Sequence, residues 1–352
     1  MITIAHLVDD AGLGGVTRSL DTLTAKLGPG FSHRRHVVRP SLPLPPNLDA
    51  EIIVVHFTMA WAKLPFLAAL RAHAGRRPLV LVEHSYTECY ERLQVGSLSR
   101  FRAMLRLAYG RADRVVAVSH GQAAWLRGAR LLPSTKLAVI PAATDCAGLV
   151  AIDLPDPAGQ LRLGAYGRYC YQKGFDTLLE AMRSIPPATA MLQLAGFGPD
   201  ATALRAAAAR CPGVSIGGPV NGLAKFLAGV DAIVVPSRFE AFGQVALEAR
   251  AAGRPLIATR VDGLVEQVAD GAGLLVAPDD PAALALAIRH LASLPIAPMG
   301  ATARASTTGH LDRSIAAWRR LFTELAAPAG AASRAAINTA MRTSIQRQLN
   351  LL

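Results

Sequence analysis

Two glutamates, Glu240 and Glu248, flank the start of a predicted helix in the second half of the chain. The first amides of a helix have no partner within it, so those of Phe242, Gly243 and Gln244 could hold a phosphate. Glu248 could accept hydrogen bonds from ribose hydroxyls, and Glu240, just outside the helix, could meet a transferred sugar. The pattern therefore predicts a diphosphate-binding site with a carboxylate on either side. Two solvated surface acids are the alternative interpretation.

Two cations, Arg168 and Lys173, follow another predicted strand at a spacing of five positions. Fixed cations in a closed cleft stabilise the charge that develops on a departing phosphate. The segment is not a P-loop, because Lys173 precedes Gly174 and no Ser or Thr follows that glycine. Two ordinary surface charges would give the same spacing, so the interpretation depends on the neighbouring motifs.

Two further groups come directly after predicted strands. Gly14 and Gly15, with Arg18 behind them, follow the first strand, and the position of the third glycine does not fit the dinucleotide-binding fingerprint. We expect these glycines to approach the donor phosphate or the acceptor, with a simple strand-to-helix turn as the alternative. His84 follows a later strand and is predicted to point toward the same cleft, although a structural histidine remains equally open.

Short β-branched runs alternate with Ala- and Leu-rich segments along the chain, which is typical of parallel sheets flanked by helices. In the first half we predict strands at 2–8, 35–39, 52–56, 79–83, 115–119 and 137–141, and helices at 16–27, 63–74, 97–109 and 121–127. In the second half we predict strands at 162–167, 191–196, 214–216, 232–236, 256–259 and 273–276, and helices at 175–185, 201–210, 222–229, 243–252, 264–268, 281–293 and 315–325. The sequence thus predicts an α/β protein with two Rossmann-like domains facing each other across a cleft.

The predicted domain organisation follows from this rhythm. Residues 1–150 form the first domain, 151–160 a linker rich in Pro and Gly, and 161–307 the second domain. Residues 308–327 contain a C-terminal helix. The segment 328–352 contains arginines and no acidic residue, so we predict either a basic amphipathic helix on an anionic membrane or a disordered tail.

The composition limits the class of protein. A chain of 352 residues can form two domains with separate cores. No apolar run approaches the roughly 20 residues that cross a bilayer, and the N-terminal residues do not resemble an export signal. The four cysteines are scattered without a Cys-x-x-Cys pair, so we expect neither disulfides nor a zinc site, and a cytoplasmic location.

The net charge of +12 calls for an anionic partner or a generally basic proteome. Nucleic acid is not expected, because aromatic residues are few and no recognition motif is present. Anionic nucleotides and an anionic membrane surface both remain as candidate partners.

The spacing of Glu240 and Glu248 resembles the Glu-x7-Glu motif of the family 4 type of retaining glycosyltransferases, which have the GT-B fold. The likeness covers residues 2 to about 291, and the blocks around Gly14, Arg168 and Lys173 agree in order and spacing. It implies transfer of a hexose-type sugar from a UDP- or GDP-sugar with retention of configuration and no required metal or other cofactor. It also implies that the C-terminal helix packs back on the first domain.

The resemblance implies a role for each matching residue. Arg168 and Lys173 would neutralise the donor diphosphate, while Glu240 and His84 position the sugar. Val220 lies in the turn where relatives bind the nucleobase through the backbone.

The acceptor is a matter of hypothesis. Arg100, Arg102 and Arg106 crowd the predicted helix 97–109 of the first domain, the half that receives acceptors in this family. We therefore expect a lipid-linked or polysaccharide acceptor of cell-envelope glycan synthesis. We expect the protein to lie peripherally on the cytoplasmic face of the inner membrane, with Arg18 also facing the acceptor or membrane. A solvated helix face is the alternative.

Other functions remain open on the same fold. They are a sugar-nucleotide epimerase, a phosphorylase and a non-catalytic membrane-associated binding protein.

Overall fold

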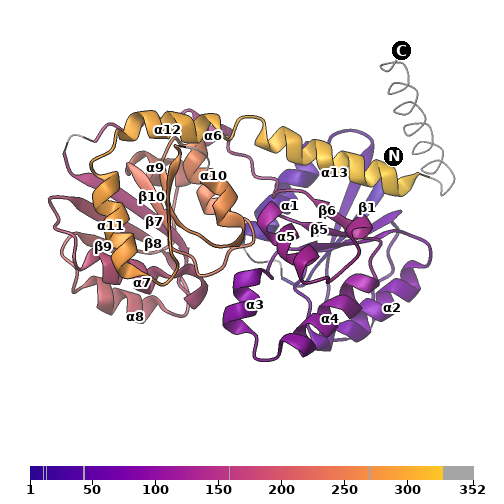
Figure 1. The fold of residues 1–352 in the computed structure, drawn as a ribbon. Coiled ribbons are helices and arrows are strands. Elements are labelled where there is room, and N and C mark those ends of the chain that lie inside the picture. Colours follow the sequence, from indigo (N-terminus) through magenta and orange to yellow (C-terminus); the bar gives the residue numbers. More distant parts are fainter. Residues whose placement is uncertain (11, 13, 43, 158, 269–270, 328–352) are drawn as a thin grey trace, which may run out of the picture.

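The structure, a computed structural model, describes residues 1–327 except 11, 13, 43, 158 and 269–270. It forms two lobes, each built on a six-stranded parallel sheet between layers of helices (Figure 1). The predicted α/β class with two Rossmann-like domains is confirmed. The segment 328–352, for which we predict a basic or disordered tail, lies outside the described residues.

The first lobe contains the strand order β2-β1-β3-β4-β5-β6. Its strands are β1 (Ile2–Val8), β2 (Phe31–Val37), β3 (Ile52–Val55), β4 (Leu79–Glu83), β5 (Arg114–Ala117) and β6 (Leu137–Val139). One face packs against α2 (Leu64–Ala74), α4 (Leu98–Gly110) and α5 (His120–Gly128), and the other against α1 (Gly15–Lys26). Central strands such as β3 and β4 are therefore buried on both faces, which explains their continuous apolar sequence.

The second lobe contains the order β12-β11-β10-β7-β8-β9. Its strands are β7 (Leu161–Arg168), β8 (Ala190–Phe197), β9 (Val214–Gly217), β10 (Ala232–Val235), β11 (Leu256–Thr259) and β12 (Gly273–Val276). Helices α7 (Phe175–Met182), α8 (Ala201–Ala208) and α11 (Pro281–Leu291) cover one face, and α9 (Leu223–Ala228) and α10 (Gln244–Ala251) the other.

The chain returns to the first lobe at its end. Helix α12 (Ile296–Ala305) lies on the second lobe and α13 (His310–Ala326) crosses to the first (Figure 1). An apolar stripe on α13, which includes Ile315, Trp318 and Phe322, packs into the core beneath β1 and β3. The predicted return of the C-terminal helix is confirmed.

No single helix in the described part of the chain is long and apolar enough to cross a membrane. Helix α11 and the Ile296–Ala326 segment reach that length and apolar character only when taken together, and they are bent by 105° relative to each other.

Several local predictions differ from the structure. Strand β2 starts at Phe31 and ends at Val37, not at 35–39, because it pairs with all of β1 from Ile2 onward. The side chains of this edge strand are mostly polar and partly exposed, so its sequence lacks the continuous apolar run that indicates a strand. The predicted helix 264–268 is a 3-10 helix, Asp262–Gln267. The short helices α3 (Glu88–Gln94) and α6 (Ala147–Val150), together with α12, were not predicted.

Candidate active site

The connection from β10 to α10 carries the central motif. Gly243 caps α10 with a φ of +89°, and a Cβ at this position would lie 2.5 Å from Leu264 Cδ2. Glycine is therefore required here for both conformation and space. Among the described residues, none accepts a hydrogen bond from the amides of Phe242, Gly243 or Gln244. These N–H groups at a helix N-terminus can bind an anion.

Glu240 lies in the same loop and pairs with Lys173. The two side chains form an ion pair and are 14% and 19% exposed. Ser237 Oγ donates to the same carboxylate over 3.3 Å. The backbone of the loop is held as well, because Glu240 N donates to Asp262 Oδ2 over 3.3 Å. The structure thus brings a predicted sugar-binding acid against a predicted phosphate-binding cation.

The two loops meet through a close backbone contact. Gly174, which follows Lys173, has a φ of +62°, and a Cβ there would lie 2.1 Å from the carbonyl oxygen of Pro236. No larger residue fits, so Gly174 holds the β7–α7 connection against the β10–α10 loop. Arg168 is the last residue of β7 and is exposed.

Glu248 is 2% exposed and binds groups from both lobes. Its Oε1 accepts from Arg18 Nη1 and its Oε2 from the Tyr166 hydroxyl, each over 2.7 Å. Burial, reinforced by the Glu248 carboxylate, raises the pKa of Tyr166 well above its usual value, so this hydroxyl remains a donor. Arg18 was predicted to face the acceptor or membrane. Its guanidinium contacts the second lobe at Glu248, and the Arg18 side chain is 53% exposed, so the facing role stays a prediction.

The glycine loop of the first lobe touches the start of α10. Gln244 Nε2 donates to the carbonyl oxygen of Gly15 over 2.9 Å, and a Cβ on Gly15 would lie 2.8 Å from Gln244 Oε1. Gly14 caps α1, and a Cβ there would meet nothing within 4 Å. A cavity of about 370 Å³ adjoins this contact and is lined by Arg18 and Glu248 among others. Gly15 and Arg18 of the first lobe therefore meet Gln244 and Glu248 of the second.

His84 follows β4 and is half-buried. Burial lowers its pKa to about 4, so the ring is neutral near pH 7. Its Nε2 lies 3.2 Å from His56 Nδ1. It lines a small enclosed space together with Ser19 of α1 and Pro141.

The remaining predicted residues lie elsewhere. Val220 follows β9 and packs at the edge of the core that contains Tyr166. On α4, Arg102 makes a two-pronged ion pair with Glu91, and Arg106 donates to two backbone carbonyls. Arg100 lies over the Trp61 ring at 5.6 Å. Internal acceptors therefore hold the guanidinium groups of Arg102 and Arg106, and a contact of this helix with an acceptor or a membrane stays a prediction.

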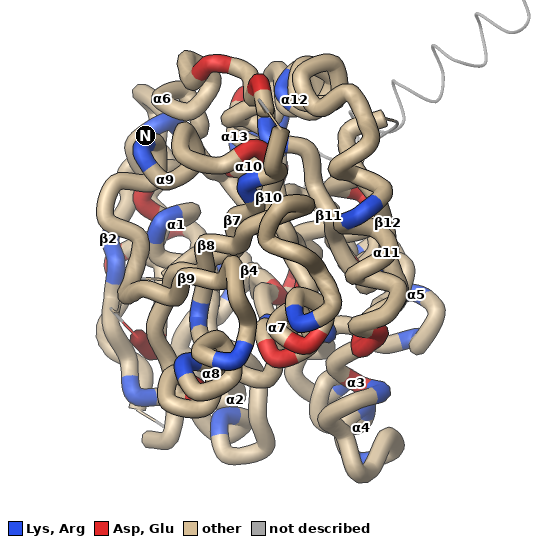
Figure 2. Tube along the Cα trace, turned by 90° about the vertical axis from the view of Figure 1, so that its left-hand side faces the viewer, with Lys and Arg blue, Asp and Glu red and all other residues tan. Residues whose placement is uncertain are grey.

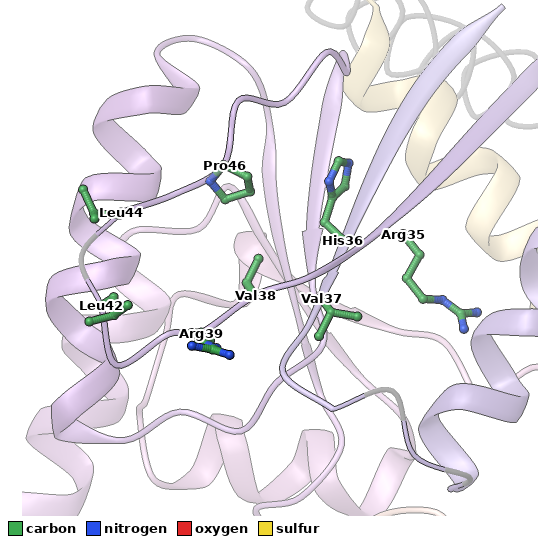
Figure 3. Close-up of a pocket in the computed structure, with 8 residues that line it drawn as sticks. All are labelled: Arg35, His36, Val37, Val38, Arg39, Leu42, Leu44 and Pro46. Carbon is green, nitrogen blue, oxygen red and sulfur yellow. The ribbon is translucent and has the colours of Figure 1, made fainter.

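Basic and acidic residues are interspersed on one side of the molecule (Figure 2). On the side drawn in Figure 2, basic residues lie on many elements with acidic residues among them. A separate hollow of about 460 Å³ lies at the edge strand β2, where Val37, Leu42 and Leu44 are exposed beside Arg35 and Arg39 (Figure 3). It contains none of the predicted site residues.

Three contributing residues were not predicted. Tyr166 has the sequence signal of a core strand residue, and only the fold brings its hydroxyl to Glu248. Asp262 has a φ of +37° and accepts from the amides of Glu240 and Cys89, which joins the lobes. The short Val-Asp-Gly turn after β11 could have indicated Asp262 from the sequence. His56 was also missed, since it ends an ordinary apolar strand. Groups of three or more His, Cys, Asp or Glu able to hold a metal ion are absent from the described residues.

This chain resembles known proteins both in sequence and in fold. Residues 9–147 match the family model "Glycosyltransferase Family 4", and residues 160–293 match "Glycosyl transferases group 1". The chain is 49% identical over 78 residues to a D-inositol 3-phosphate glycosyltransferase of Frankia alni, which covers 22% of this chain and 19% of that protein. It is 50% identical over 68 residues to a glycogen synthase of Mycobacterium tuberculosis, covering 19% and 16%. The matched stretches thus span less than a fifth of these curated relatives.

Solved structures match over much longer stretches. Anabaena Alr3699/HepE in complex with UDP and glucose has a TM-score of 0.72 at 18% identity, covering 92% of this chain and 99% of that one. WaaG, a glycosyltransferase involved in lipopolysaccharide biosynthesis, has a TM-score of 0.67 at 16% identity, covering 91% and 99%. At these identities the likeness shows the shared fold.

Proposed function

This chain is a family 4-like glycosyltransferase of the GT-B fold, and on that premise we propose that it transfers a hexose-type sugar from a nucleotide diphosphate with retention of configuration. One observation carries the proposal. The amides of Phe242–Gln244, which have no hydrogen-bond acceptor among the described residues, lie in the same loop as Glu240, which contacts Lys173. An anion site, a carboxylate and a cation therefore adjoin one another.

The proposed binding mode uses the amides and the cations together. The helix N-terminus would hold a donor phosphate oxygen. Lys173 would exchange its ion pair with Glu240 for the diphosphate, and exposed Arg168 would join it from the end of β7. Glu240, released from Lys173, would then accept hydrogen bonds from sugar hydroxyls. Glu248, already oriented by Arg18 and Tyr166, has lone pairs left for the ribose.

The proposed reaction balances without a metal. The bond between the anomeric carbon and the diphosphate oxygen breaks, and the acceptor oxygen bonds to the same face of that carbon. The acceptor proton passes to the departing diphosphate, whose charge the amides, Lys173 and Arg168 stabilise. Neutral His84 would orient the sugar rather than supply charge.

We propose UDP-glucose as the first donor to test, because the structural relative Alr3699/HepE is described in complex with it. GDP-sugars are the second choice. For the acceptor we propose a lipid-linked or polysaccharide glycan of the cell envelope, handled at the cytoplasmic side of the membrane. The support for a membrane surface is the exposed Leu98, which lies on the same helix as Arg100, and the exposed Trp61, over whose ring the Arg100 guanidinium lies.

The deciding experiment is a binding and product assay. Calorimetry with UDP, GDP and their glucose or mannose conjugates should give micromolar binding of one nucleotide class. Incubation with labelled donor should then yield an α-glycoside from an α-linked donor, as seen in the anomeric NMR signals. Release of an epimerised sugar nucleotide without any glycoside would identify the protein as an epimerase instead of a transferase. A phosphorolysis product would identify a phosphorylase, and no binding of any sugar nucleotide would refute the proposal.

A further inference from the structure

Four histidines form one line of hydrogen bonds across the sheet of the first lobe. His33 Nδ1 lies 3.0 Å from His6 Nε2, and His6 Nδ1 lies 3.0 Å from His56 Nε2. His56 Nδ1 lies 3.2 Å from His84 Nε2. Successive ring centroids are 5.2, 5.2 and 5.5 Å apart. We call these four residues the histidine chain.

The strand register builds the histidine chain. His33 on β2 is level with Ile4 of β1, two residues before His6. His6 is level with Val54 of β3, two residues before His56. The same step from β3 to β4 leads to the fourth ring. Since residues two apart share a face, the chain climbs diagonally over one face of the sheet to the carboxyl ends of the strands.

The rings of the histidine chain are neutral. It passes through the apolar core between the sheet and helices α1 and α13, where His6 is fully buried and His56 nearly so. Burial lowers the pKa of His6 to about 3 and that of His84 to about 4, and it lowers the pKa values of His33 and His56 as well. Each ring near pH 7 thus has one N–H and one lone pair.

Neutral rings in such a line cannot choose their tautomers independently. Each N···N contact needs one hydrogen and one lone pair, so either all four rings carry the hydrogen on Nδ1 or all four carry it on Nε2. A mixed arrangement would oppose two hydrogens or two lone pairs in a buried contact, at about 1–3 kcal/mol for each unmade bond. The tautomer at one end therefore determines the tautomer at the other.

The far end of the chain favours one direction. His33 Nε2 is buried and has no partner among the described residues. An orphaned buried N–H is rarer in proteins than an orphaned acceptor, so a lone pair is favoured at this atom. His33 then carries its hydrogen on Nδ1, and every ring down to His84 does the same. His84 consequently has its free hydrogen on Nδ1.

We propose that His33, His6 and His56 are positioning residues that transmit this hydrogen-bond direction, so that His84 offers an N–H donor to an oxygen of the bound ligand. The recognised chemistry is a hydrogen-bond acceptor, such as a sugar oxygen. This last step rests on the proposed function, whereas the direction of the hydrogen bonds along the histidine chain does not.

The test is ¹⁵N NMR of the full chain labelled at histidine, at pH 7.5 and without ligand. In the wild-type protein all four rings should be neutral and protonated on Nδ1. In His33→Asp the new carboxylate can only accept, so His6 should move its hydrogen to Nε2, and His84, three strands away, should do the same. Protonation of His6 instead is disfavoured by its burial. In His33→Leu, which is similar in size and offers no acceptor, His84 should keep its Nδ1 hydrogen.

A matched control lies on the same strand. His36→Asp adds the same charge to β2, but His36 lines the hollow of Figure 3 and takes no part in the chain. It should leave the tautomer of His84 unchanged. Unlike tautomers among the four wild-type rings, or a folded His33→Asp protein whose His84 stays protonated on Nδ1, would overturn the proposal. Because the wild-type spectrum is decisive by itself, a poorly folding variant does not remove the test.

The ligand step has its own measurement. His33→Asp should weaken donor-sugar binding or turnover about tenfold, while the matched control His36→Asp stays within twofold. A reversed His84 tautomer with unchanged binding and turnover would refute its assigned role toward the ligand. If no sugar nucleotide binds the wild-type protein, the proposed function fails while the NMR result on the chain still stands.

Discussion

Arg18 in the first lobe donates a hydrogen bond from Nη1 to Oε1 of Glu248 in the second lobe, over 2.7 Å. Glu248 is 2% exposed, whereas the Arg18 side chain is 53% exposed. A buried carboxylate of the candidate site is thus held by a cation that reaches across from the other lobe. A change in the arrangement of the two lobes would therefore alter the orientation of Glu248, the carboxylate that we assign to the ribose.

Replacing Arg18 tests this coupling. Arg18→Met leaves the Glu248 carboxylate with the Tyr166 hydroxyl as its remaining partner, so we expect stability to fall by about 1–2 kcal/mol. Donor affinity should fall about tenfold because the carboxylate loses its orientation. Urea unfolding and calorimetry measure the two effects. Arg34→Met, which removes an exposed ion pair with Asp49, is the control and should change neither by more than experimental error.

Glu240→Gln tests the carboxylate next to the cation. If Glu240 stabilises the sugar in the transition state, kcat should fall about 10²-fold while the donor Kd changes less than threefold. Steady-state kinetics measures kcat, and calorimetry measures the donor Kd. The exposed Glu180→Gln serves as control. Parallel losses of affinity and turnover would argue against the assigned role.

Gly243→Ala tests the anion site. The positive φ and the contact with Leu264 should together cost about 1–3 kcal/mol of stability, and the shifted amides should bind the donor diphosphate poorly. Gly30→Ala is a suitable comparison, since Gly30 has a φ of +99° but open space around the added carbon. It should destabilise less and leave UDP binding intact. Normal nucleotide binding by Gly243→Ala would show that these amides do not bind the donor diphosphate.

The buried histidines predict a pH dependence of stability. In the unfolded chain these rings titrate near their usual 6.5, but in the folded protein His6 titrates at about 3 and His84 at about 4. The unfolded state therefore binds more protons in this window, and stability should be complete above about pH 6.5 and fall as the pH drops toward 4. Each such ring contributes up to about 1.4 kcal/mol per pH unit.

Urea unfolding between pH 7.5 and 5 measures this slope. His84→Gln should reduce this slope by up to about 1.4 kcal/mol per pH unit, because one buried neutral ring is removed. A free energy of unfolding that stays constant over this range would contradict the neutral, buried state of the histidine chain.

The membrane hypothesis has a direct test at helix α4. Leu98 is 48% exposed next to Arg100, so Leu98→Ser should weaken binding to vesicles of phosphatidylglycerol and phosphatidylcholine several-fold at low salt. Leu286→Ser, at a 67% exposed position on the second lobe, is the control. Co-sedimentation gives the bound fraction, and equal effects of both substitutions would disfavour α4 as the contact.

Much of the fold was predictable from local patterns. Continuous apolar runs such as Ile52–Val55 predict buried parallel strands, and the alternation with helical segments predicts two Rossmann-like lobes. The edge strand β2 was placed wrongly because its half-exposed polar residues give no such run. The Glu240–Glu248 spacing around Gly243 indicated a glycosyltransferase motif, and the family models agree with that identification.

The amino-acid sequence by itself thus determined the fold class and the strand ends where polar groups gather, because hydrophobic periodicity and glycine positions act over a few residues. Tertiary structure alone decided which of these groups meet. Arg18 contacts Glu248 across 230 positions, and the histidine chain exists only in one strand register. Pairings of this kind depend on how distant segments pack, and a shift of one residue in register would place His6 on the other face of its sheet.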